Sequence, residues 1–230
     1  MTVAPPVAFA PYAVLSVVHL VVLQVAPDPM AVTVTKVLLM PALALGVLLS
    51  FRPLRGAVPA LVIAAIALSW GGDVLLTFPG DLWFVVGLVS FLLAHVAYIA
   101  LFLRLPPRGR RLPTWTLVYV PWYAAFLALL GPHLGALFVP VAIYGLVLGT
   151  MAALAGGVGG VVALGGALFV VSDSVLALGR FLPGYEFALH DLTVMTTYLA
   201  AQGLIALGVV GLQRGGVSAP RRSASAAQPA

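Results

Sequence analysis

The sequence of 230 residues contains no cysteine and few charged side chains. The absence of cysteine excludes disulfides, thiolate nucleophiles and cysteine-ligated metal sites. Only 7% of the residues are charged, against roughly a quarter in an ordinary soluble domain, and 63% are hydrophobic. This composition predicts an integral membrane protein.

The charges that are present are mostly basic. Eleven Lys and Arg residues give a formal net charge of +5. They lie mostly in short segments between apolar runs and near the C-terminus, as membrane topology requires. We therefore expect the lipid bilayer as a partner and no nucleic acid.

Eight apolar stretches have about the 20 residues that a helix needs to cross the hydrocarbon core. They run near residues 7–26, 31–51, 56–78, 81–104, 112–130, 133–155, 159–182 and 188–212. Proline and glycine residues between them, as in Pro79-Gly80 and Pro183-Gly184, favour turns. The sequence predicts an all-α polytopic membrane helix bundle, with two tandem four-helix repeats as one open arrangement. The first stretch has no basic leader and no Ala-x-Ala site, so we expect it to be retained.

The basic residues predict the orientation of this bundle, since Lys and Arg in short loops stay on the cytoplasmic side. One side of the expected topology carries Arg52, Arg55, Arg104, Arg108, Arg110, Arg111, Arg214, Arg221 and Arg222. The other side carries Asp28, Asp81, His133, Arg180, Glu186, His190 and Asp191. Both termini of this multi-pass cell-membrane protein are therefore expected to be cytoplasmic. Residues 213–230, rich in Arg, Ser, Ala, Gly and Pro, are expected to form a disordered cytoplasmic tail.

Two aspartates lie inside apolar stretches, where an ionisable side chain indicates a functional site. Asp73 follows Ala-Leu-Ser-Trp-Gly-Gly, and Asp173 follows Ala-Leu-Phe-Val-Val-Ser. At about 1.5 Å per residue, Asp73 lies roughly 8 Å and Asp173 roughly 13 Å from the outer end of its span. Both aspartates are thus expected in the outer half of the membrane, on helices that run in the same direction.

Other spans carry polar side chains at related depths. Lys36 lies about 8 Å, His19 about 10 Å and His95 about 20 Å below the outer end of its span. In the last span, Tyr198 and Gln202 share a helical face with Asp191. We expect these groups to surround one pocket that opens to the outer side.

A purely structural interpretation remains open for each of these side chains. Lys36 at the depth of Asp73 is placed to neutralise it, and His95 and Gln202 are placed to hydrogen-bond between helices. Several such groups in one chain favour a functional site, because a structural bundle needs none of them.

Glycine pairs and scattered histidines provide no further motif. The pairs are Gly71-Gly72, Gly156-Gly157, Gly159-Gly160 and Gly165-Gly166. None fits a phosphate-binding loop, so close packing of helices is the better interpretation. The four histidines have no metal-ligand spacing. We expect no metal site and no cofactor.

An ordered set of short motifs runs through most of the chain. In the first half these are Thr35-Lys36 with Pro41, Ser69-Trp70-Gly71-Gly72-Asp73 with Leu76, and Phe84, Gly87, Phe91 and Ala94-His95-Val96-Ala97-Tyr98. In the second half they are Tyr144-Gly145, Met151, Gly166-Ala167-Leu168-Phe169, Ser172-Asp173-Ser174 and Thr197-Tyr198-Leu199-Ala200-Ala201-Gln202. This ordered set resembles the YhhN-like lysoplasmalogenase family, and the resemblance covers about residues 30 to 210. The first span and the C-terminal segment carry little of it, so His19 gains no support.

The resemblance implies a membrane hydrolase that cleaves the vinyl ether bond of lysoplasmalogens. The products would be a fatty aldehyde and a glycerophospho-ethanolamine or glycerophospho-choline. The implied partner is a lysophospholipid substrate, and no protein partner is indicated.

Vinyl ether hydrolysis begins with a proton transfer to the β-carbon and passes through an oxocarbenium ion that water captures. It needs a protonated acid and an anion beside the cation, and two carboxyl groups in unequal surroundings can divide these tasks. We expect Asp73 beside Lys36 to be the ionised partner and Asp173 to be the acid.

Supporting roles follow for the other polar residues. His95 is expected to activate the water, and Tyr198 and Gln202 to orient the ether oxygen or the water. Arg180 and Lys36 are expected to meet the substrate phosphate.

Two other classes of function remain open at this point. Tandem repeats along the membrane normal are known in transporters, so a small-solute or lipid transporter is the main alternative. A lipid-binding or assembly scaffold is a third. An enzyme releases aldehyde in detergent without a gradient, whereas a transporter moves a solute in liposomes.

Overall fold

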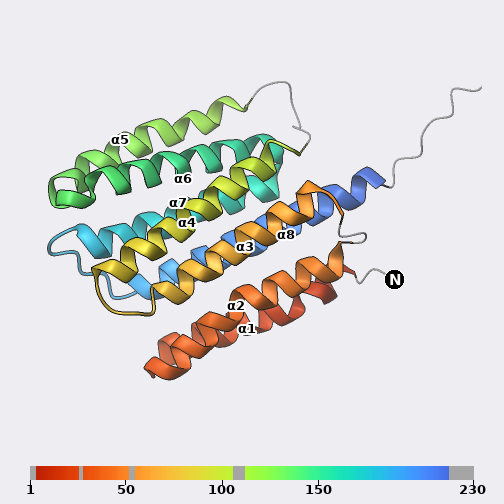
Figure 1. Cartoon of the computed structure of the whole chain (residues 1–230), viewed down its shortest axis with the longest axis horizontal. Helices are drawn as coiled ribbons and strands as arrows, with labels where there is room; N and C mark the ends of the chain where they lie inside the picture. The colour runs from red at the N-terminus through yellow and green to blue at the C-terminus, as the bar shows by residue number, and fades with distance from the viewer. Residues whose placement is uncertain (1–3, 26–27, 52–54, 106–111, 218–230) are drawn as a thin grey trace, which may run out of the picture.

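The computed structural model describes residues 4–25, 28–51, 55–105 and 112–217. Within these residues, eight helices are long and apolar enough to cross a membrane. The helices are α1 (Pro5–Val25), α2 (Pro29–Ser50), α3 (Ala57–Leu75), α4 (Asp81–Phe102), α5 (Tyr119–Leu130), α6 (Phe138–Val158), α7 (Gly160–Phe181) and α8 (His190–Val217). The prediction of an all-helical, multi-pass membrane protein is confirmed (Figure 1).

The helix ends lie within three residues of the predicted spans, except at the start of α5, the start of α6 and the end of α8. Helix α8 continues to Val217 rather than ending near residue 212. The fifth span is built from the 3-10 helix η1 (Thr114–Val118), α5 and the 3-10 turn η2 (Gly131–His133), while η3 (Gly135–Leu137) precedes α6. The predicted tail beyond Val217 lies outside the described residues. So do six of the arginines that predict the orientation, namely Arg52, Arg108, Arg110, Arg111, Arg221 and Arg222.

Local sequence sets where these helices begin. Asp28 caps α2, since its carboxylate accepts a hydrogen bond from the amide of Ala31 at 2.8 Å, and Pro29 occupies the first turn, where a missing N–H has no cost. The predicted turn at Pro79-Gly80 is present, and Gly80 has a φ of 107°, a conformation that glycine adopts without steric cost.

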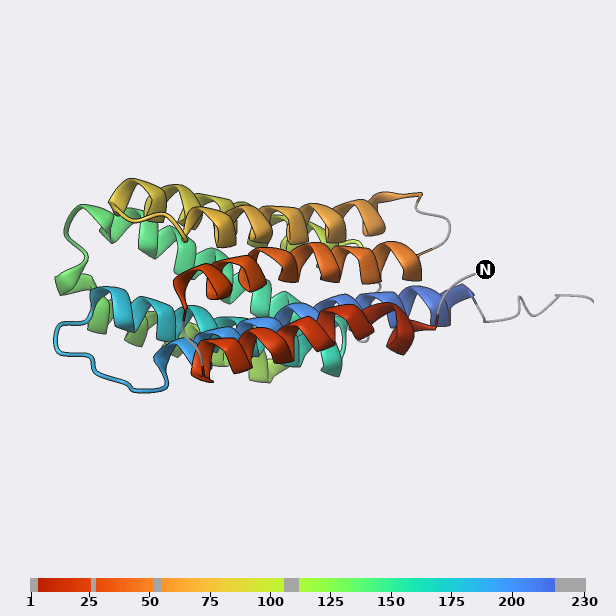
Figure 2. The same ribbon diagram turned by 90° about the horizontal axis from the view of Figure 1, so that it is seen from below.

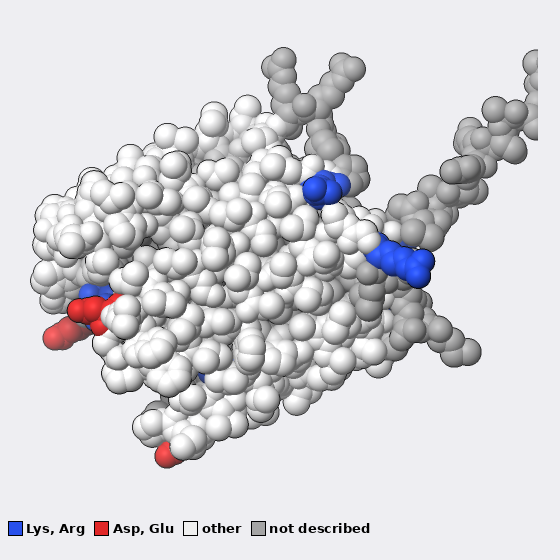
Figure 3. Space-filling view, in the orientation of Figure 1, with Lys and Arg blue, Asp and Glu red and all other residues white. Residues whose placement is uncertain are grey.

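The helices run up and down, so their connections alternate between two ends of the bundle (Figures 1 and 2). We call one the acidic end, which carries Asp28, Asp81, Glu186 and Asp191, and the other the basic end, which carries Arg55, Arg104 and Arg214. Figure 3 shows the acidic side chains at one end of the molecule and the most prominent basic ones at the opposite end. Helix α8 is the most buried of the eight spans, and α5, at the edge, is the least buried.

Glycine pairs bring neighbouring helices close together, as the sequence predicts. A Cβ atom on Gly72 would lie 2.5 Å from the Phe91 ring of α4, and one on Gly166 would lie 2.8 Å from Ala155 of α6. The pair Gly159-Gly160 differs, because it forms the junction between α6 and α7.

The contact between α7 and α8 provides a stability prediction. A Cβ atom on Gly165 would lie 3.0 Å from the carbonyl oxygen of Ala201 and 2.7 Å from the Ile205 side chain. Because the backbone of α8 cannot give way locally, Gly165→Ala is expected to lower the free energy of unfolding by about 1–3 kcal/mol. Thermal unfolding of the purified protein in detergent measures this loss.

Gly211→Ala provides the matched control. A Cβ atom at Gly211 of α8 meets nothing within 4 Å, and alanine favours a helix over glycine by roughly 0.5–1 kcal/mol. This variant is expected to unfold at or slightly above the wild-type temperature. Equal destabilisation by both substitutions would contradict the close packing of α7 on α8.

Candidate active site

A pocket lies near the acidic end of the bundle, lined by side chains from each helix from α2 to α8. Its volume is about 830 Å³ including the open mouth. Its walls are mostly aliphatic and aromatic, and the polar residues among them are Lys36, Asp73, Tyr144, Ser172, Asp173, Ser174 and Tyr198. Both aspartates therefore line one apolar pocket.

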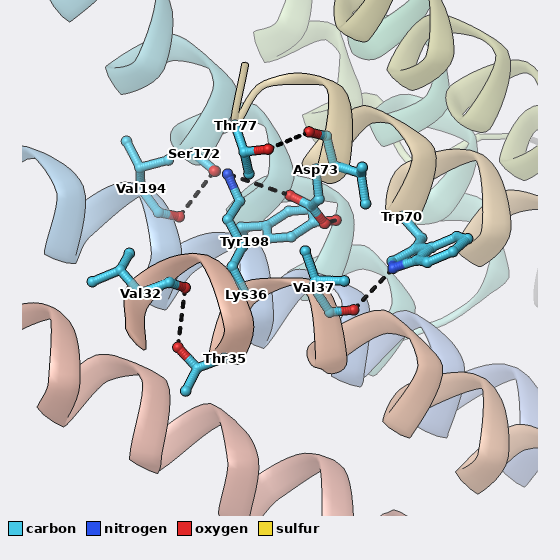
Figure 4. Close-up of polar contacts among 11 residues, drawn as sticks. Val32, Thr35, Lys36, Val37, Trp70, Asp73, Thr77, Ser172, Val194 and Tyr198 are labelled. Carbon is cyan, nitrogen blue, oxygen red and sulfur yellow. Dashed lines mark hydrogen bonds and ion pairs between the residues drawn. The ribbon is translucent and has the colours of Figure 1, made fainter. Parts of the chain in front are cut away.

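Asp73 is held by one cation and one hydroxyl from two other helices. Lys36 Nζ of α2 lies 3.8 Å from Asp73 Oδ1, and the Tyr198 hydroxyl of α8 donates to Asp73 Oδ2 at 2.7 Å. The side chain of Asp73 is only 5% exposed, against 20% for Lys36. Figure 4 shows the three side chains converging from α2, α3 and α8. The predicted pairing of Lys36 with Asp73 is thus present.

Close packing of α3 on α4 directs Asp73 into this pocket. Gly72 faces the Phe91 ring without a side chain of its own. The Ser90 hydroxyl of α4 donates to the carbonyl oxygen of Leu68 at 2.6 Å. The C-terminal part of α3 is thereby fixed against α4.

A second contact fixes Lys36 on α2. Pro41 has no N–H, so the helical carbonyl of Val37, four residues earlier, lacks its usual donor. The indole N–H of Trp70 on α3 donates to that carbonyl at 2.9 Å (Figure 4). This contact joins α2 to α3 one residue from Lys36 and one turn from Asp73.

Asp173 has different neighbours. The Tyr144 hydroxyl of α6 donates to Asp173 Oδ2 at 2.5 Å, and His95 Nε2 of α4 lies 3.9 Å from the same oxygen. His95 is fully buried. Its ring packs edge-on against Tyr144 and Phe169, with centroid distances of 5.3 and 4.7 Å. No Lys or Arg lies within ion-pair distance of Asp173 in the part of the chain that the structure describes.

The serines flanking Asp173 tie α7 to its neighbours. Ser172 donates to the carbonyl oxygen of Val194 on α8 at 3.0 Å (Figure 4). Ser174 accepts a hydrogen bond from the indole N–H of Trp122 on α5 at 3.1 Å. These contacts restrict the rotation of α7 and so the direction of the Asp173 side chain.

Aromatic side chains and one ion pair form the rim. Phe84 and Phe181 line the pocket and meet edge to face, with centroids 5.7 Å apart. Arg180 pairs with Asp81 and lies over the Phe84 ring at 4.9 Å. Arg180 is 43% exposed, so it flanks the mouth rather than lining the pocket.

The other predicted site residues lie behind or outside the pocket lining. Gln202 is fully buried and accepts a hydrogen bond from Tyr98, and His95 lies behind Asp173. Asp191 is exposed beside His190, so only Tyr198 of the predicted α8 face reaches the pocket. His19 is buried against Thr35, between α1 and α2. Among the residues that the structure describes, no group of three or more His, Asp or Glu side chains is arranged to hold a metal ion.

Comparison with known proteins places this chain in a family. The model of the YhhN family matches residues 31–209. The chain belongs to the YhhN family. The matched range includes every residue that lines the pocket, from Lys36 to Tyr198. No solved structure matches the chain.

Two relatives represent the bacterial and animal members that resemble this chain. A Mycobacterium tuberculosis protein named lysoplasmalogenase is 36% identical over 168 residues, which cover 68% of this chain and 61% of that protein. Human lysoplasmalogenase TMEM86B is 34% identical over 171 residues, which cover 74% of this chain and 73% of that protein. The match thus spans less than two thirds of the mycobacterial protein.

Proposed function

We propose that this YhhN-family protein is a membrane hydrolase that cleaves the vinyl ether bond of lysoplasmalogens. The observation that carries the proposal is one apolar pocket lined by two aspartates from different helices, of which Asp73 is buried and Asp173 has a side chain only 11% exposed. The names of the relatives, lysoplasmalogenase in each case, supply the substrate class. The products are a fatty aldehyde and a glycerophospho-ethanolamine or glycerophospho-choline.

The unequal surroundings of the two aspartates support a division of tasks. Asp73 has Lys36 beside it, and a cation favours the ionised carboxylate. Asp173, like Asp73, accepts a hydrogen bond from a tyrosine hydroxyl, but it has a buried histidine in place of the cation, and an apolar pocket without a cation favours the neutral acid. Asp173 is therefore the proton donor and Asp73 the anion.

The reaction then follows from these charges. The proton of Asp173 moves to the β-carbon of the vinyl ether, and the double bond supplies the electron pair for the new C–H bond. The oxocarbenium ion that results is stabilised by the Asp73 carboxylate, as carboxylates stabilise sugar oxocarbenium ions. Water adds to the cationic carbon and loses a proton to the Asp173 carboxylate. The hemiacetal collapses to aldehyde and alcohol.

The remaining predicted residues have supporting roles. Tyr198 holds Asp73 through its hydrogen bond. His95 lies behind Asp173, with its Nε2 atom 3.9 Å from Asp173 Oδ2. Gln202 supports the buried core by accepting a hydrogen bond from Tyr98. Arg180 at the mouth and Lys36 in the wall meet the phosphate of the headgroup, while the single hydrocarbon chain occupies the apolar part of the pocket.

The orientation of the protein determines from which side a lysolipid enters. Basic loop residues remain cytoplasmic, so the basic end is expected to face the cytoplasm and the pocket the outer leaflet. The cysteine-free chain permits single-cysteine labelling at two exposed positions, Glu186 at the acidic end and Arg55 at the basic end. A membrane-impermeant maleimide applied to intact cells is expected to label Glu186→Cys and to leave Arg55→Cys unmodified. The opposite pattern would contradict this orientation.

A panel of lysolipids tests the activity. The purified full-length protein in detergent is offered matched lysolipids with a vinyl ether, an alkyl ether or an ester link, and the released aldehyde and fatty acid are measured by mass spectrometry. Aldehyde from the vinyl ether alone is the expected result. Release of fatty acid from the ester would instead indicate a lysophospholipase, and no cleavage of any lipid would refute the proposal.

A further inference from the structure

Tyr144 is the closest polar neighbour of Asp173 and has no role in the scheme above. Its hydroxyl donates to Asp173 Oδ2 at 2.5 Å. The two residues lie on different helices, α6 and α7, so their alignment depends on how the bundle packs. Tyr144 lines the pocket but is only 8% exposed.

The surroundings of Tyr144 fix the direction of this hydrogen bond. The buried His95 ring stands edge-on to the Tyr144 ring at 89°. Gly145, the next residue of α6, packs against Tyr123 of α5, where a Cβ atom would lie 3.2 Å from the ring. The Tyr123 hydroxyl in turn donates to the carbonyl oxygen of Ala142 at 3.0 Å. The turn of α6 that carries Tyr144 is thus held from two sides.

We propose that Tyr144 is a positioning residue that determines which carboxyl oxygen of Asp173 carries the transferred proton. The inference rests on the proposed vinyl ether hydrolysis and assigns a residue to its first step. Asp173 Oδ2 accepts the Tyr144 hydroxyl hydrogen, so the acidic proton resides on Oδ1. Only one of the two oxygens can then deliver the proton, and its direction is set by the Tyr144 bond.

The hydrogen bond also matters after the proton has moved. The O–H bond at Asp173 Oδ1 breaks as the C–H bond forms at the β-carbon, and Asp173 becomes a carboxylate. Hydrogen bonds to an ionised acceptor are roughly twice as strong as neutral ones. The Tyr144 hydroxyl keeps its own proton and stabilises the Asp173 carboxylate. The Asp73 carboxylate is stabilised by Lys36 and Tyr198 instead.

Tyr144→Phe removes the hydroxyl and retains the ring that packs on His95. With a vinyl ether lysolipid, kcat is expected to fall at least about tenfold while KM stays within about twofold, since the lost interaction acts on proton transfer rather than on binding. Tyr185→Phe is the matched control, because Tyr185 also packs edge-on against a histidine, His190, but does not line the pocket. This control is expected to retain wild-type kcat.

Infrared spectroscopy gives a readout that does not depend on turnover. The chain has only six acidic residues, so few carboxyl bands overlap, and the difference between wild type and Asp173→Asn assigns the C=O band of protonated Asp173. Tyr144→Phe is expected to move this band to higher wavenumber, because a C=O group that loses a hydrogen bond stiffens. If the Phe variant does not fold, incorporation of fluorotyrosine into the wild-type chain is expected to move the band to lower wavenumber, since a more acidic phenol is a stronger donor.

The two readouts separate the two proposals. A wild-type protein that releases no aldehyde, but whose Asp173 band shifts as described, would refute the hydrolase function and support the Tyr144 contact. An active wild type whose Asp173 band is absent, or is unchanged by the substitutions at Tyr144, would overturn the role of Tyr144 and leave the hydrolase function standing.

Discussion

Asp173→Asn is expected to reduce turnover of a vinyl ether lysolipid at least about a hundredfold, the scale on which a general acid contributes. The amide keeps the size of the side chain and can still accept the Tyr144 hydrogen bond. It carries no transferable acidic proton, so the β-carbon cannot be protonated from this position. Aldehyde release by the purified variant, with thermal unfolding measured in parallel, checks this result.

Asp191→Asn is the matched control for this substitution. Asp191 also belongs to the second half of the chain, but it is exposed at the start of α8 and does not line the pocket. Its variant is expected to keep wild-type turnover. Near-normal turnover of a folded Asp173→Asn protein would contradict the assignment of Asp173 as the acid.

Asp73→Asn is expected to produce a loss of similar size, at least about a hundredfold, for a different reason. The substitution removes the anion beside the oxocarbenium ion and leaves Lys36 Nζ, now unpaired, in the same wall of the pocket. The positive charge of Lys36 then opposes the developing cation. Turnover of the purified variant on the same lysolipid measures the loss.

A double-mutant cycle with Lys36→Met isolates this charge effect. Residues that form one ion pair show non-additive effects, so Asp73→Asn with Lys36→Met is expected to have a kcat no lower than that of Asp73→Asn alone, while loss of the phosphate contact of Lys36 appears in KM. Additive losses of kcat would mean that Lys36 acts on the reacting atoms independently of Asp73. Full activity of the folded Asp73→Asn protein would remove the carboxylate pair from the mechanism.

Much of the bundle follows from the sequence because apolar length alone determines a membrane span. The same reasoning predicts the Lys36–Asp73 pair, since a rise of about 1.5 Å per residue converts sequence position into depth. Depth is half of the information that locates a side chain in a bundle. The rotation of each helix about its axis is the other half, and it depends on packing against helices distant in sequence.

Because the rotation of each helix does not follow from depth, the sequence does not show which polar side chains line the pocket. His95 and Gln202 have suitable depths, yet they lie in the buried core and not among the pocket-lining residues. Asp191 shares a helical face with Tyr198 but stands too near the end of α8 to be buried. The tandem-repeat arrangement stays a prediction.

The sequence alone does not predict that Tyr144 and Trp70 hold other residues of the site in place. Tyrosine and tryptophan in a membrane span are usually interface anchors or core residues, and only a hydrogen-bond partner on another helix shows that they position a site residue. The partners of Tyr144 and Trp70 are Asp173 and the Val37 carbonyl. Tyr144, Asp173 and Trp70 all belong to motifs on which the family resemblance depends, so those motifs were the available signal.

Hydrolysis in deuterium oxide tests the central claim most directly. Protonation at the β-carbon places one solvent hydrogen on the carbon next to the aldehyde group. The purified wild-type protein is given a vinyl ether lysolipid in deuterium oxide, the aldehyde is reduced at once to its alcohol, and the label is located by mass spectrometry. We predict that the wild type forms aldehyde with one deuterium at that carbon and that Asp173→Asn loses this activity. Aldehyde without deuterium at that carbon, or no aldehyde from the wild type, would contradict protonation of a vinyl ether by Asp173.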